Sequence, residues 1–66
     1  MIRVLHCFGA MNIGGAETLI MNIYRKIDKS KIQFDFLVFS KDKGFFDDEI
    51  KLLGGKIYHL DSFGTL

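Results

Sequence analysis

One short segment constrains the fold of this chain more than any other, because three different patterns follow one another within it. An apolar run at residues 2–8 leads into a loop with the pair Gly14-Gly15, and a strongly periodic stretch follows at residues 16–27. This order predicts a strand, a loop and a helix. Two glycines before a helix let another molecule approach backbone N–H groups at the positive end of the helix dipole. The segment therefore predicts a place that suits a phosphate.

The flanking elements show how this loop is expected to be held. Residues 2–8 carry apolar side chains on both faces, which is typical of a parallel strand buried on two sides. Cys7 lies in this strand and is the only cysteine, so we expect a buried, inert thiol and no internal disulfide. The helix is predicted by a wide apolar stripe at helical spacing, made by Ala16, Leu19, Ile20, Ile23, Tyr24 and Ile27.

The remaining chain repeats the alternation of strand and helix. Residues 32–40 read as a second strand, with Phe34, Phe36 and Val38 on one face. A second helix is expected from about residue 46 to 53, and residues 56–60 read as a third strand. The acidic side chains that open this helix are expected to be solvated, and Gly54-Gly55 should end it with one glycine in the left-handed conformation. These acidic residues are Asp47, Asp48 and Glu49.

The order β-α-β-α-β predicts an α/β fold, a truncated Rossmann-like unit. Right-handed crossovers give a parallel three-stranded sheet of order 3-2-1 with both helices on one face. The other sheet face and the free edge of the first strand then lack a cover. We therefore expect residues 1–66 to be a single partial domain, the first part of a larger one. The isolated chain is expected to form a homodimer or to exchange elements with a second copy.

Charge and motif spacing exclude several classes of protein. The net charge is +1 with acidic and basic residues mixed, which argues against a nucleic-acid partner. No apolar run approaches the roughly 20 residues that span a bilayer, and a signal-peptide pattern is absent, so we expect a cytoplasmic location. The glycine spacing fits neither the dinucleotide fingerprint nor the phosphate loop of ATPases. Ser40 and Lys41 stand where a dinucleotide site needs an acidic residue.

The polar side chains near the loop allow two interpretations each. Asn12 either binds a substrate hydroxyl or shapes a turn, and Glu17 either stabilises the first helical turn or contacts a ligand. His6 and His59 lie within strands without a second metal-binding residue at ligand spacing, so we expect packed or partly exposed histidines. No catalytic residue, metal site or cofactor is predicted from these residues.

Five short motifs, taken together and in order, resemble the start of bacterial family 4 glycosyltransferases. The resemblance covers nearly the whole chain. Its motifs are Arg3-Val4-Leu5-His6, Gly14-Gly15-Ala16-Glu17, Gln33-Phe34-Asp35-Phe36-Leu37-Val38, Phe46-Asp47-Asp48-Glu49-Ile50 and Leu53-Gly54-Gly55-Lys56-Ile57.

The resemblance implies a retaining enzyme of the GT-B fold, in which two Rossmann-like domains face each other across a cleft. Such enzymes transfer a sugar from a nucleotide-diphosphate sugar to a carbohydrate or lipid-linked acceptor, in capsule, exopolysaccharide or lipopolysaccharide biosynthesis. They generally need no metal, and a peripheral place at the inner membrane face is implied. Carried over by position, Gly14 and Gly15 offer backbone N–H groups to the donor diphosphate, and Asn12, Ala16 and Glu17 are further loop contacts.

The resemblance also implies limits, because the C-terminal domain of the family has no counterpart in these 66 residues. We therefore expect no transferase activity from the chain alone. Two alternatives stay open: a non-catalytic α/β module that binds a nucleotide or a protein through the glycine loop, and a purely structural half-domain that dimerises.

Overall fold

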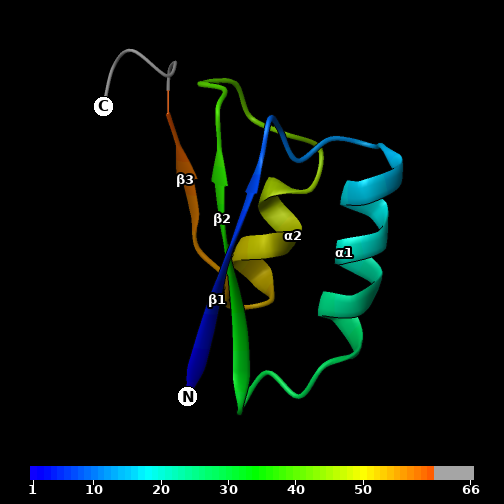
Figure 1. The fold of residues 1–66 in the computed structure, drawn as a ribbon, viewed down its shortest axis with the longest axis vertical. Coiled ribbons are helices and arrows are strands. Elements are labelled where there is room, and N and C mark those ends of the chain that lie inside the picture. The colour runs from blue at the N-terminus through cyan, green and yellow to red at the C-terminus, as the bar shows by residue number, and fades with distance from the viewer. Residues whose placement is uncertain (61–66) are drawn as a thin grey trace.

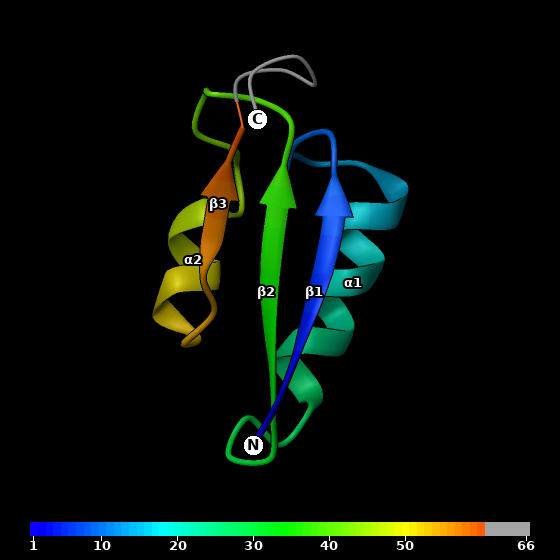
Figure 2. The ribbon, with the colours of Figure 1, turned by 60° about the vertical axis from the view of Figure 1, so that its left-hand side comes forward.

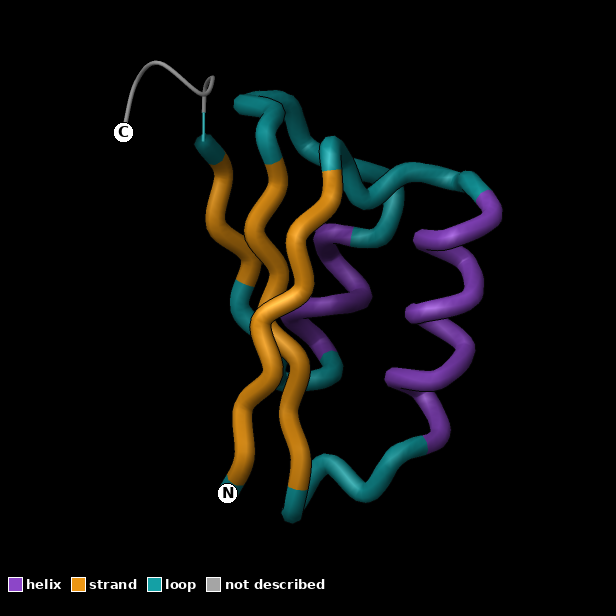
Figure 3. The backbone as a smooth tube through the Cα atoms, in the orientation of Figure 1, coloured by secondary structure: helices purple, strands orange, loops and turns teal. Residues whose placement is uncertain are grey.

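Strands and helices alternate along the chain in the computed structural model, which describes residues 1–60 (Figures 1 and 3). The predicted element order is confirmed, and the ends differ only slightly. The elements are β1 (Ile2–Phe8), α1 (Gly15–Lys26), β2 (Ile32–Val38), α2 (Asp47–Leu52) and β3 (Ile57–His59). The residues after 60 lie outside the described part. Neither helix in residues 1–60 is long and apolar enough to cross a membrane.

The sheet has the predicted topology. Its strands are parallel and lie in the order β1-β2-β3, which is the order 3-2-1 from the opposite edge. β1 pairs with β2 along its whole length, whereas the short β3 pairs only with the carboxyl-terminal part of β2. Both helices cover the same face, α1 behind β1 and α2 behind β3 (Figure 2). The predicted fold class is therefore confirmed.

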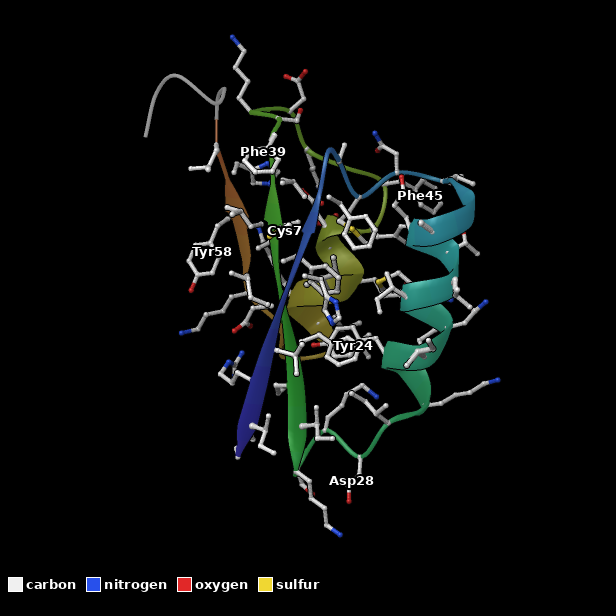
Figure 4. All side chains as sticks on the ribbon, in the orientation of Figure 1. Cys7, Tyr24, Asp28, Phe39, Phe45 and Tyr58 are labelled. Carbon is white, nitrogen blue, oxygen red and sulfur yellow. The ribbon has the colours of Figure 1, made fainter. Side chains whose placement is uncertain are left out.

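The core fills the space between this face and the helices. Tyr24 of α1 points toward the sheet (Figure 4), and its ring stacks on Phe34 with a centroid distance of 5.0 Å. Its hydroxyl donates a hydrogen bond of 2.6 Å to Oε1 of the buried Gln33, so the one polar atom of the ring is satisfied. The buried apolar residues are Met11, Met21, Tyr24, Phe34, Phe36, Val38, Phe46 and Ile50.

The expectation that β1 is buried on both faces is wrong. Leu5 is 54% exposed, and Cys7 is exposed as well, which corrects the prediction of a buried thiol. The reason is that both helices of the described chain lie on one side of the sheet, so nothing within residues 1–60 covers the other. Tyr58 of β3 points away from the helix layer, toward this open side (Figure 4).

The buried arc of α1 differs from the apolar stripe that the sequence predicts, because it includes Met21, which the stripe omits, and only Tyr24 of the stripe is fully buried. Met21 and Tyr24 are fully buried, whereas Leu19 and Ile23 are 62% and 43% exposed. A helix that packs on a single sheet layer buries only one arc of its surface. Leu19 and Ile23 lie on the opposite arc.

The end of α2 follows the predicted glycine chemistry. Gly54 has φ +99°, the left-handed conformation that glycine adopts without steric cost. Its N–H donates to the carbonyl of Lys51, and the N–H of Gly55 donates to the carbonyl of Ile50, which is the Schellman pattern of bonds. This tight reversal brings the chain directly back into β3.

Candidate functional site

Two loops meet at the carboxyl edge of the sheet. β1 and β2 run in the same direction, so the loops that follow them, residues 9–14 and 39–46, leave the sheet on the same side (Figures 1 and 3). In open α/β sheets, ligands bind beyond the carboxyl ends of the strands. The predicted glycine loop therefore lies where this architecture binds ligands.

The start of α1 presents backbone N–H groups for which residues 1–60 show no hydrogen-bond acceptor. Gly14 is extended, with φ −153° and ψ 170°, and no side chain caps the helix. The first helical hydrogen bond runs from the N–H of Thr18 to the carbonyl of Gly14. The N–H groups of Gly15, Ala16 and Glu17 precede that bond, so they have no acceptor within the helix. These donors are available to an anion, and the helix dipole favours one there.

Gly15 is not required by the fold itself. A Cβ atom built at this position meets nothing within 4 Å, and its φ is not positive. A Cβ on Gly14 would lie 3.0 Å from the carboxylate oxygens of Glu17, the far end of a flexible side chain. The open space at Gly15 leaves the backbone accessible to a ligand atom.

Glu17 lies in the first turn of α1, as predicted, and its carboxylate turns back beside Gly14. A negative side chain at this place complements the helix dipole. The same carboxylate places a negative charge next to Gly14. This charge would repel an anion that binds close to Gly14.

Asn12 connects the two loops. Its Oδ1 accepts a hydrogen bond of 2.9 Å from the N–H of Phe45, and the carbonyl of Met11 accepts one of 2.9 Å from the N–H of Phe46. The oxygen of Asn12 is therefore engaged with the protein itself. The buried Met11, which the sequence did not single out, anchors the same stretch in the core.

Asp47 is buried, which corrects the expectation of a solvated acidic cluster. Its side chain is 2% exposed, whereas that of Asp48 is 74% exposed. Oδ2 of Asp47 lies 2.9 Å from Nε2 of His59, and Oδ1 is buried with no hydrogen-bond partner among residues 1–60. No local pattern in the sequence predicts this pair, because Asp47 belongs to α2 and His59 to β3.

The other histidine, His6, is half-buried and packs against Phe34, as expected of a packed or partly exposed histidine. Its ring centroid lies 4.3 Å from that of Phe34, and its Nε2 is buried with no hydrogen-bond partner in the described part of the chain. Desolvation lowers the pKa of this imidazole. His6 and His59 are not brought together into one site, and residues 1–60 contain no cluster of three metal-binding side chains.

Two curated bacterial proteins are similar in sequence over nearly all of the chain. EpsF of Bacillus subtilis (strain 168), which carries a provisional glycosyltransferase name, is 55% identical over 62 residues, or 94% of the chain. CapH of Staphylococcus aureus, named a capsular polysaccharide biosynthesis glycosyltransferase, is 36% identical over 61 residues, or 92% of the chain. Both relatives are named glycosyltransferases.

These relatives are much longer than the chain, which spans 16% of EpsF and 17% of CapH. Their names therefore describe proteins of which this chain matches one part. No model of a known protein family and no solved structure matches the chain.

Proposed function

We propose that this chain is the N-terminal part of a glycosyltransferase. The observation that carries the proposal is the 55% identity to EpsF over 94% of the chain. The whole protein would transfer a sugar from a nucleotide-diphosphate sugar to a carbohydrate or lipid-linked acceptor. The name of CapH favours polysaccharide biosynthesis as the setting. The motifs that resemble family 4 support a retaining enzyme of the GT-B fold. We further propose that this enzyme acts in the cytoplasm.

The glycine loop is the proposed contact to the donor diphosphate. Gly14 immediately precedes α1 and Gly15 is its first residue, and the N–H groups of Gly15 and Ala16 have no acceptor within the helix. Fixed backbone donors stabilise the negative charge that develops on a departing phosphate. In this proposal the loop forms one side of the donor site, and the chain alone catalyses no transfer.

A comparison of two glycines tests the donor contact. The probes are UDP, GDP and inorganic diphosphate, and the measurement is the amide chemical shift of each residue of the chain. We expect shifts at Gly14, Gly15 and Ala16. Gly15→Ala should reduce the affinity about 10-fold or more, because its methyl group fills the approach to the backbone. Gly9→Ala is the matched control, since a Cβ at Gly9 also meets nothing within 4 Å.

The outcomes separate the open alternatives. Binding that depends on the nucleotide base and not on Gly15 would favour a non-catalytic nucleotide-binding module. No shift with any probe, together with concentration-dependent dimerisation, would favour a structural half-domain and contradict the donor contact.

A chimaera tests the transferase assignment itself. The aligned 62 residues of EpsF are replaced by those of this chain, and both proteins are assayed for sugar transfer from a panel of UDP-sugars and GDP-sugars to lipid and saccharide acceptors. We expect the chimaera to use the same donor as EpsF. A folded chimaera without activity beside an active EpsF would contradict the proposal.

A further inference from the structure

The glycine loop, residues 9–14, is hydrogen-bonded to the segment 44–46. This segment belongs to the other loop at the carboxyl edge of the sheet, residues 39–46. Two successive N–H groups of this segment, those of Phe45 and Phe46, donate to Oδ1 of Asn12 and to the carbonyl of Met11, each at 2.9 Å. Together these bonds fix the path of the chain two residues before Gly14.

Gly44 allows the two loops to approach this closely. A Cβ at Gly44 would lie 2.7 Å from the carbonyl oxygen of Met11, a distance that real Cβ atoms essentially never show. The neighbouring atom is backbone, so it cannot turn aside as a flexible side chain would. Any larger residue at position 44 would therefore displace the glycine loop or the segment 44–46.

The segment 44–46 is itself anchored by α2 and β3. The N–H of Asp47, the first residue of α2, lies 3.3 Å from the carbonyl of Gly44, and its carboxylate is held by His59 at the end of β3. Phe46 is buried in the core, and the guanidinium of Arg25 lies over its ring at 5.8 Å from the centroid. The segment 44–46, which contacts the glycine loop, is therefore anchored in the core through Phe46.

We propose that Asn12 and Gly44 are positioning residues that set the orientation of the N–H groups of Gly14 and Gly15. This inference rests on the proposed function, because it assigns these residues to the donor-diphosphate contact. Asn12 acts through its side-chain oxygen on the segment 44–46, and it does not bind the sugar nucleotide with that atom. Fixed donors lose less free energy on binding than donors that must first be ordered.

The test uses the free chain and amide spectra without ligand. Asn12→Ala and Gly44→Ala should move the amide signals of Gly14 and Gly15, and Asn12→Ala should speed hydrogen exchange at Phe45 at least 10-fold. Asn12→Asp retains an acceptor oxygen, so it should restore slow exchange at Phe45. Ile32→Val at the opposite end of β2 is the control for general loss of stability, and it should leave the glycine amides unmoved.

A second measurement separates this inference from the proposed function. Inorganic diphosphate is titrated into each variant, and we expect Asn12→Ala and Gly44→Ala to bind it several-fold more weakly than the unchanged chain. Loop signals that move in a chain that never binds diphosphate would support the positioning and contradict the donor contact. Diphosphate binding that is unchanged in both variants, with unmoved glycine signals, would overturn the positioning.

Discussion

The imidazole of His59 contacts both the carboxylate of Asp47 and the backbone of the loop after β2, residues 39–46. Its Nε2 lies 2.9 Å from Oδ2 of Asp47, and its Nδ1 lies 2.7 Å from the carbonyl oxygen of Ser40. A carbonyl oxygen can only accept a hydrogen bond, so Nδ1 donates to Ser40. One side chain therefore connects the end of β3, the start of α2 and the loop after β2. This places three elements of the carboxyl edge in a fixed relation.

Loss of the buried carboxylate should destabilise the chain. We expect Asp47→Ala to lower the free energy of unfolding by about 1–3 kcal/mol, because it removes the partner of His59 inside the protein. Asp47→Asn should cost less, since its amide can donate to Nε2. Asp48→Ala is the matched control and should change little, because the ion pair of Asp48 with Lys43 is exposed. Urea unfolding measures all three, and equal stabilities of Asp47→Ala and Asp48→Ala would contradict the role of the pair.

His6 should make stability depend on pH. Burial lowers the pKa of its imidazole in the folded chain, so the unfolded chain binds a proton more readily. The free energy of unfolding is therefore unaffected by His6 above the unfolded pKa of about 6.5, and it decreases as the pH drops below that value. His6→Phe keeps an aromatic ring against Phe34 and removes the titration. We expect a flatter profile for this variant in unfolding experiments between pH 5 and 8. His59 is present in both proteins, so parallel profiles would rule out a contribution of His6.

Arg3 should control the titration of Asp35. Its Nε and Nη2 donate to the two carboxylate oxygens at 2.9 and 2.7 Å, and the N–H of Lys56 donates to Oδ1. The hydrogen bonds from Arg3 are the main cause of the lowered pKa of Asp35. The stability contributed by this carboxylate is therefore present above the unfolded pKa of about 3.9 and is lost as the pH falls through the lower folded pKa.

We expect Arg3→Met to raise the pKa of Asp35 toward its ordinary range, as measured by carboxyl carbon chemical shifts. Asp28 provides an internal reference in the same spectra. Its pKa is lowered by hydrogen bonds from Ser30, with no contact to Arg3, so it should not respond. A shift of both carboxyl groups would indicate a general change of structure instead of a lost pair.

Gly55 should be far less tolerant of substitution than Gly9. A Cβ at Gly55 would lie 2.5 Å from the carbonyl oxygen of Phe34 and 2.6 Å from the hydroxyl of Tyr24. Gly55→Ala therefore forces the loop before β3 away from β2 and should cost about 1–3 kcal/mol, as overpacking of a core does. Gly9→Ala should stay within about 0.5 kcal/mol of the unchanged chain. Thermal unfolding of the two variants checks the contrast.

The sequence was sufficient for the order of elements, the topology of the sheet and the helix stop at Gly54. Periodicity distinguishes strand from helix locally, and the handedness of parallel crossovers leaves few arrangements of three strands and two helices. The glycine pair at the start of α1 could also be recognised, because it belongs to one continuous segment of the sequence.

Burial and long-range contacts were decided by the tertiary structure. Cys7 looks buried from its apolar neighbours, but it is exposed because both helices of residues 1–60 cover the other face. Asp47 looks solvated beside Asp48, but α2 turns it toward His59, 12 residues further along the chain. Asn12 and Phe45 are 33 residues apart and meet only because both loops leave the same edge of the sheet. A local pattern determines what each segment becomes, whereas the packing of separate segments determines which side chains meet.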